Sequence, residues 1–142
     1  MANVTWVIHG VFDTEETFNE QEHKKHPYMG NFHTHGLNEY NDQRELCIVL
    51  ALPKEKAAGL LNNMGLRVAN NETVFTEGIR TDILENGMDV ELLSFDKDST
   101  LYVILPDANG KLPMDDDCKE PYKYQYEYAK ILSENKDYVW RY

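Results

Sequence analysis

The residues best suited to chemistry in this sequence are two histidines in the segment NFHTHGL, His33 and His35. Side chains two residues apart on a β-strand project from the same face, so two imidazole rings placed in this way could hold one metal ion. His9, in the earlier segment VIHGVF, becomes a third ligand if the strands that carry the two segments pair. The spacing therefore points to His33, His35 and His9 as the centre of a metal site.

Carboxylates near these histidines could complete the ligand shell and leave one position open for water, as in zinc hydrolases. The candidates are Asp13, Glu39, Asp42 and Glu45. The alternative interpretation is that strand histidines are core or rim residues whose ring nitrogens bond to backbone or carboxylate groups. Our first expectation is therefore a protein without a cofactor, and zinc or another transition metal at the three histidines is the second.

The same strand is the predicted binding region in the absence of a metal. The residues assigned to that region are His33, Thr34, His35, His9 and Glu39. The leading hypothesis is a non-enzymatic module that binds a small molecule or a protein there, and the alternative is a small metal-dependent hydrolase. The remaining histidines, His23 and His26, flank two lysines in a polar segment and are expected to be solvated.

The two cysteines are interpreted as reduced thiols and not as nucleophiles. Cys47 lies in the apolar run LCIVLAL, which favours a small buried side chain over an accessible thiolate. Cys118 follows three aspartates, whose negative charge would raise the pKa of its thiol. The sequence contains no glycine-rich nucleotide motif and no nucleophile elbow around a serine.

Charge and composition exclude several classes of function. The chain has 142 residues, 42% of them hydrophobic, and a formal net charge of −11. An acidic surface repels nucleic acid and anionic membranes, and no apolar run reaches the ~20 residues that span a bilayer. The first ten residues lack the features of a secretory signal. We therefore expect a soluble cytoplasmic protein with no nucleic-acid or membrane partner.

Apolar and turn patterns predict the elements that position the histidines. The run at 45–53 is continuously apolar, which predicts a strand covered on both faces. Pro53 begins the clearest helix, whose apolar residues recur at helical spacing to about Asn70. Further strands are expected where β-branched and aromatic residues are frequent, at 4–12, 31–37 and 100–106.

Three other segments complete the expected architecture. The polar stretch 14–30 is interpreted as a surface insertion, and Asn86–Gly87 as a type I′ turn between two strands. The tyrosine-rich tail, 119–142, fits either a strand or a helix, and we favour a helix that also contacts a partner or a second copy of the chain. The whole pattern predicts a single α+β domain over 1–142, a mostly antiparallel sheet packed by one long and one or two short helices.

Three short patterns, taken in order, resemble one bacterial protein family. They are VIHGVFD, NFHTHGL followed by RELCIVLALP, and LPDANGKLPMDDDC. They are similar to the family labelled domain of unknown function 4262, whose members carry a Y-T-x-G-L segment and a late P-D-x-x-G segment. Thr34, Gly36 and Leu37 match the first of these, and His33 stands where the family has an aromatic residue. The resemblance covers about residues 4–118, implies a shared fold and implies no activity.

Overall fold

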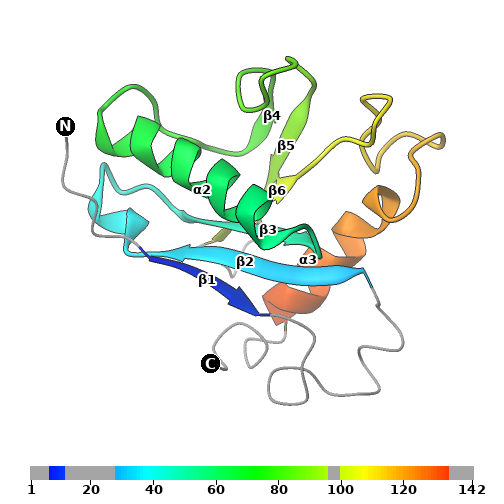
Figure 1. The fold of residues 1–142 in the computed structure, drawn as a ribbon, viewed down its shortest axis with the longest axis horizontal. Helices are drawn as coiled ribbons and strands as arrows, with labels where there is room; N and C mark the ends of the chain where they lie inside the picture. Colours follow the sequence, from blue (N-terminus) through cyan, green and yellow to red (C-terminus); the bar gives the residue numbers. More distant parts are fainter. Residues whose placement is uncertain (1–6, 12–27, 96–99, 135–142) are drawn as a thin grey trace.

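A computed structural model of the protein describes residues 7–11, 28–95 and 100–134, with only the backbone described for 7–11 and Asn38. Its strands are β1 (Val7–Val11), β2 (Met29–His35), β3 (Glu45–Leu50), β4 (Gly78–Arg80), β5 (Val90–Leu93) and β6 (Thr100–Ile104). They form one six-stranded sheet in the order β1-β2-β3-β6-β5-β4 (Figure 1). β3 and β6 pair in parallel and the other neighbours are antiparallel, which confirms the predicted α+β fold with a mostly antiparallel sheet.

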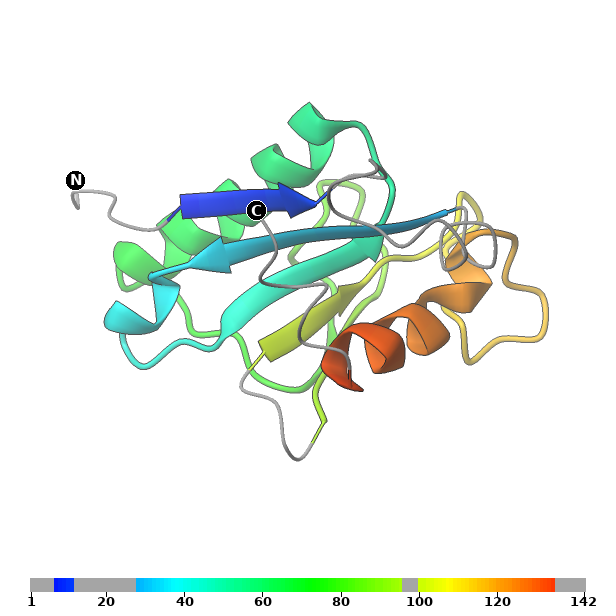
Figure 2. The same ribbon diagram turned by 90° about the horizontal axis from the view of Figure 1, so that it is seen from below.

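The strand β3 is buried on both faces, as its continuous apolar run predicted. Leu46 and Ile48 belong to the core beneath the helix α2 (Lys54–Ala69). Cys47 and Val49 belong to a second core beneath the helix α3 (Gln125–Glu134). Because alternate side chains of a strand point to opposite faces, the two helices cover opposite sides of the sheet (Figures 1 and 2).

The helix α2 lies where the sequence predicted it. Pro53 is its N-cap, and the Pro53 carbonyl accepts hydrogen bonds from the backbone N–H groups of Lys56 and Ala57. Asn70 is the C-cap. The residues that α2 buries against the sheet recur three or four positions apart and include Ala57, Leu61, Met64 and Val68.

The final helix predicted for the tail is confirmed over Gln125–Glu134, after a short 3-10 turn at Tyr122–Tyr124. Tyr128 and Leu132 point into the second core and are fully buried. Residues 135–142 lie outside the described part of the chain. No helix of the described ranges is long and apolar enough to cross a membrane.

The predicted Asn86–Gly87 hairpin turn is wrong in its type and in its strands. Gly87 has the left-handed φ of 75°, but Asn86 is not among the non-glycine residues with positive φ, which a type I′ turn requires. The strands that pair are β4 and β5, and they are joined by residues 81–89. Ile83 and Leu84 in this connection pack against the core beneath α2, which a two-residue turn would not allow.

The predicted surface insertion at 14–30 extends two residues too far. Residues 12–27 lie outside the described part of the chain, but Met29 and Gly30 are buried members of β2. A Cβ atom at Gly30 would meet the carbonyl oxygen of Leu50 at 2.5 Å. The close approach of β2 to β3 therefore requires glycine at position 30.

Candidate functional site

The register of the sheet places two of the three predicted histidines, His9 and His33, in one row with Cys47 across three strands. His9 on β1 lies opposite His33 on β2, and His33 lies opposite Cys47 on β3. The first two strands do pair, which was the condition for His9 to approach the other histidines, and the structure shows this at the level of the backbone. The side chain of His9 lies outside the described part of the structure.

The side chains of His33 and His35 meet on one face of β2. Their Nε2 atoms are 3.1 Å apart, and the rings meet edge to face with centroids separated by 4.9 Å. His33 is 4% exposed and His35 is half-buried. The pair thus connects a buried position of the sheet to one that solvent reaches.

Asn31 anchors the buried end of this pair, two residues before His33 on the same strand. The Nδ1 atom of His33 lies 3.0 Å from Asn31 Oδ1, and the Cys47 thiol donates to the same oxygen at 3.4 Å. A carbonyl oxygen only accepts hydrogen bonds, so with the Asn31 amide in this orientation the ring hydrogen of His33 lies on Nδ1. In the neutral ring the Nε2 atom then carries a lone pair directed at His35.

This geometry fits two ligands of one metal ion. With Zn–N bonds of ~2.0–2.1 Å, two nitrogens 3.1 Å apart subtend an angle of roughly 100° at the metal, close to a tetrahedral angle. Among the residues whose side chains are described, no three His, Cys, Asp or Glu side chains are placed to hold one ion. The described part of the site therefore supplies two imidazole ligands.

Thr34 lies between the two histidines and points to the opposite face of β2. Its hydroxyl donates to Glu45 Oε1 at 2.8 Å and accepts a hydrogen bond from the Leu46 N–H at 3.0 Å. Glu45 also accepts hydrogen bonds from the backbone N–H groups of Gly36 and Leu37, at 3.2 and 3.1 Å. We call these contacts the Glu45 clamp, and they hold the end of β2 in place.

The clamp shows where the predicted strand at 31–37 ends. Gly36 adopts a left-handed φ of 91° and turns the chain into a 3-10 turn at Leu37–Glu39. Leu37 is fully buried, whereas Glu39 is exposed. The structure therefore does not group Thr34 or Glu39 with the histidine pair.

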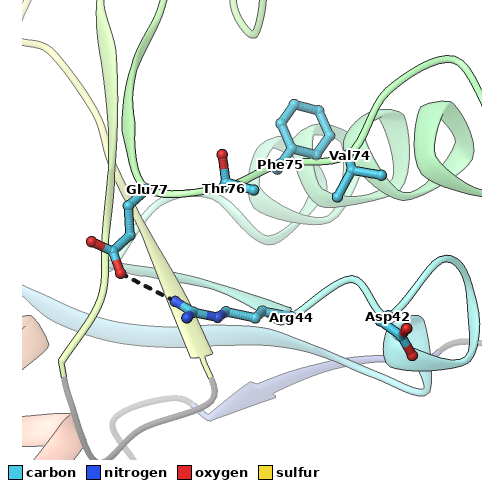
Figure 3. A pocket seen from close by; sticks show the side chains of 6 residues that line it. All are labelled: Asp42, Arg44, Val74, Phe75, Thr76 and Glu77. Atoms are coloured by element: carbon cyan, nitrogen blue, oxygen red, sulfur yellow. Dashed lines mark hydrogen bonds and ion pairs between the residues drawn. The ribbon is translucent and has the colours of Figure 1, made fainter.

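A surface pocket of about 290 Å³ lies elsewhere, and no pattern in the sequence indicated it (Figure 3). Its walls come from two segments far apart in the chain, and the lining residues are Asp42, Arg44, Val74, Phe75, Thr76 and Glu77. The buried amide of Gln43 joins the segments, because it accepts from the Phe75 N–H at 2.7 Å and donates to the Phe75 carbonyl at 3.0 Å. This side-chain bridge connects the two segments that form the walls of the pocket.

Two of the three charged residues of this pocket, Arg44 and Glu77, form an ion pair. Arg44 Nη1 lies 3.4 Å from Glu77 Oε1, as Figure 3 shows. The hydroxyl of Ser94 donates to the same carboxylate, and this hydrogen bond, together with Arg44, holds the pKa of Glu77 below its ordinary value. The pocket lining therefore offers less for recognition than the histidine pair, which we take as the candidate site.

One known protein family matches most of the chain. Residues 2–119 match the family described as Domain of unknown function (DUF4262). The chain belongs to this family. No curated protein and no solved structure matches the chain. The resemblance inferred from the three patterns is confirmed, and the DUF4262 description attaches no activity to it.

The late P-D-x-x-G pattern of DUF4262 has a structural role here. Asp107 is almost fully buried and accepts backbone hydrogen bonds at 2.9 Å from Asn109, Lys111 and Lys119. These N–H groups, that of Lys111 first, hold the pKa of the Asp107 carboxyl below its ordinary value. Gly110 provides the left-handed φ of 78° that lets the loop fold around the carboxylate.

Cys118, at the end of the DUF4262 match, lies in a loop, but its thiol is buried. Its pKa is raised, as predicted, but burial is the largest cause, followed by the charges of Asp107 and Asp115. Its Sγ donates to the Lys111 carbonyl at 3.3 Å. Both Cys47 and Cys118 are free thiols.

Proposed function

We propose that the chain is a non-enzymatic binding module and that its ligand is a divalent transition-metal ion held by His33 and His35. The observation that carries this proposal is the approach of the two Nε2 atoms to 3.1 Å. Imidazole nitrogen is a preferred ligand of zinc, copper and nickel ions. Histidines that bind metals usually donate their other N–H to an oxygen, as His33 does to Asn31.

The charge of the protein supports a cationic ligand. A net charge of −11 raises the local concentration of cations and speeds their encounter with the surface. Two imidazoles leave further coordination positions, which water or a third side chain would fill. His9, whose Cα lies opposite His33 in the ladder, is the third ligand that the sequence proposes.

The test begins with untagged protein purified without chelators. Elemental analysis and calorimetric titration with zinc, nickel and copper ions are expected to give about one ion per chain. His35→Asn should weaken binding at least about tenfold, because one imidazole is lost, whereas His23→Asn should not. Saturating metal should raise the melting temperature, since a ligand at 100 times its Kd stabilises the native state by about 2.7 kcal/mol. Metal-free wild-type protein with an unchanged melting temperature would overturn the proposal.

The second candidate is a small metal-dependent hydrolase built on the same histidines. The open coordination positions favour it, because a metal-bound water there could become a nucleophile. Metal-loaded protein should then hydrolyse a chromogenic ester or phosphate ester at a rate that follows metal occupancy and falls in His35→Asn. Binding of metal without such a rate supports the non-enzymatic module.

A contact with a protein partner or a second copy, through the tail at 119–142, is a further part of the proposal. Tyr128 and Leu132 lie in the core of the same chain, so deleting the tail would unfold the protein and test nothing. Glu127 and Lys130 are exposed on α3. Reversing both charges should reduce the mass measured by light scattering if copies of the chain associate through this helix.

A further inference from the structure

We infer that Asn31 is the positioning residue of the histidine pair, because it sets the tautomer of His33 and so directs the His33 Nε2 lone pair at His35. No pattern in the sequence indicated a functional role for Asn31. Its effect on metal affinity rests on the proposed function, whereas its effect on the tautomer does not. The two parts can therefore fail separately.

The oxygen of the Asn31 amide faces two polar groups that lie on two different strands. Asn31 is fully buried on β2, and its Oδ1 accepts from His33 Nδ1 on the same strand and from Cys47 Sγ on β3. A flipped amide would direct its NH₂ group at the thiol and at the ring, and the oxygen would lose both donors. The thiol of Cys47 thus helps to hold the amide in the orientation that presents its oxygen to His33 Nδ1.

The tautomer of His33 follows from this orientation. With the hydrogen on Nδ1, the Nε2 atom of His33 accepts the Nε2–H of His35 across 3.1 Å. A metal ion would take the place of this one hydrogen, and His35 would keep its proton by moving it from Nε2 to Nδ1. Both rings stay neutral in the exchange, and His33 keeps the same tautomer when it binds the ion.

The first experiment measures the tautomer in metal-free protein. Imidazole in water favours the Nε2–H tautomer, so long-range ¹H–¹⁵N spectra of His33 distinguish the two cases clearly. We expect wild-type His33 in the Nδ1–H form and a shift toward the Nε2–H form in Asn31→Leu, which lacks the acceptor. Gln43→Leu is the matched control, since it also removes a buried amide, but one that bonds to Phe75 and not to the histidine pair, and it should leave the tautomer unchanged. An Nε2–H form in the wild type would overturn the inference.

The second experiment measures zinc affinity in the same proteins. Asn31→Leu should bind zinc about 10–100 times more weakly, the usual effect of losing the oxygen that orients a ligating histidine. Asn31→Asp should bind at least as tightly as the wild type, because a carboxylate is a stronger acceptor. If Asn31→Leu does not fold, the wild-type spectrum and Asn31→Asp decide the matter. Equal zinc affinity in wild type and Asn31→Leu would refute the role of Asn31, and the absence of zinc binding in all of them would refute only the proposed function.

Discussion

Removal of the Glu45 clamp is the most direct test of how the end of β2 is held. The carboxylate accepts three hydrogen bonds, one from the Thr34 hydroxyl and two from the N–H groups of Gly36 and Leu37. Glu45→Ala leaves all three donors without this acceptor. Because His35 lies between Thr34 and Gly36, the loss should also loosen the histidine pair.

The expected cost follows from which of these donors water can reach. Thr34 and Leu37 are 1% and 0% exposed, whereas Gly36 is half-buried and can bond to water instead. A buried donor left unsatisfied costs about 1–3 kcal/mol, so two of them should lower the free energy of unfolding by about 2–6 kcal/mol. Glu45→Gln keeps one oxygen and should cost only about 1 kcal/mol.

Urea unfolding at neutral pH would measure these values, with Glu85→Ala, an exposed carboxylate in the 81–89 connection, as the control. A double-mutant cycle with Thr34→Val would isolate the hydrogen bond between Thr34 and Glu45. Amide exchange at Leu37 should accelerate in Glu45→Ala. A loss of stability no larger than that of Glu85→Ala would show that the clamp does not hold the strand.

Three further predictions concern other buried or charged contacts. Gln125→Leu should lower the free energy of unfolding, measured in urea, by about 2–4 kcal/mol. The side-chain amide of Gln125 accepts a hydrogen bond from the N–H of the buried residue Leu105 and donates one to its carbonyl, and leucine can do neither. Hydrogen bonds from Arg80, and to a smaller extent from Arg67, hold the pKa of the Asp82 carboxyl below its ordinary value of 3.8. The ionised carboxylate therefore stabilises the folded protein above about pH 4, and this stabilisation is lost as the pH falls and the carboxylate becomes protonated. The stability difference between wild type and Asp82→Asn should therefore shrink below about pH 4 in unfolding curves, and a difference that does not depend on pH would contradict this. Cys118, whose thiol pKa is raised by burial, should react with iodoacetamide at pH 8 more slowly in folded than in urea-unfolded protein, and equal rates would contradict its burial.

The parts of the fold that the sequence predicted are those set by patterns of nearby residues. The apolar run around Ile48 requires cover on both faces of its strand, and α2 and α3 provide it. Between Pro53 and Val68 the apolar residues recur three or four positions apart, which places them on one face of a helix. The hairpin prediction failed because Asn86–Gly87 is a local signal, whereas packing of Ile83 and Leu84 on the core decides the length of the connection.

The site was less predictable because its contacts depend on long-range pairing. The alternation of a strand was enough to place His33 and His35 on one face. It could not show that the Cys47 thiol shares the Asn31 oxygen, since that contact depends on the register between β2 and β3. The pocket beside Arg44 has the same origin, because a glutamine amide joins segments 32 residues apart in the chain.

The residues that hold the end of β2 are distinct from the two histidines that form the pair. Thr34, Gly36 and Leu37 of the Y-T-x-G-L pattern make the Glu45 clamp and the turn after it, and their contacts are internal to the protein. His33 stands at the aromatic position of that pattern, and His35 at its unspecified position. The contacts that end β2 therefore do not involve the side chains of the histidine pair. Metal binding at this pair, if measured, would be a property of this chain and of members that share both histidines, and it would not by itself assign a function to the family.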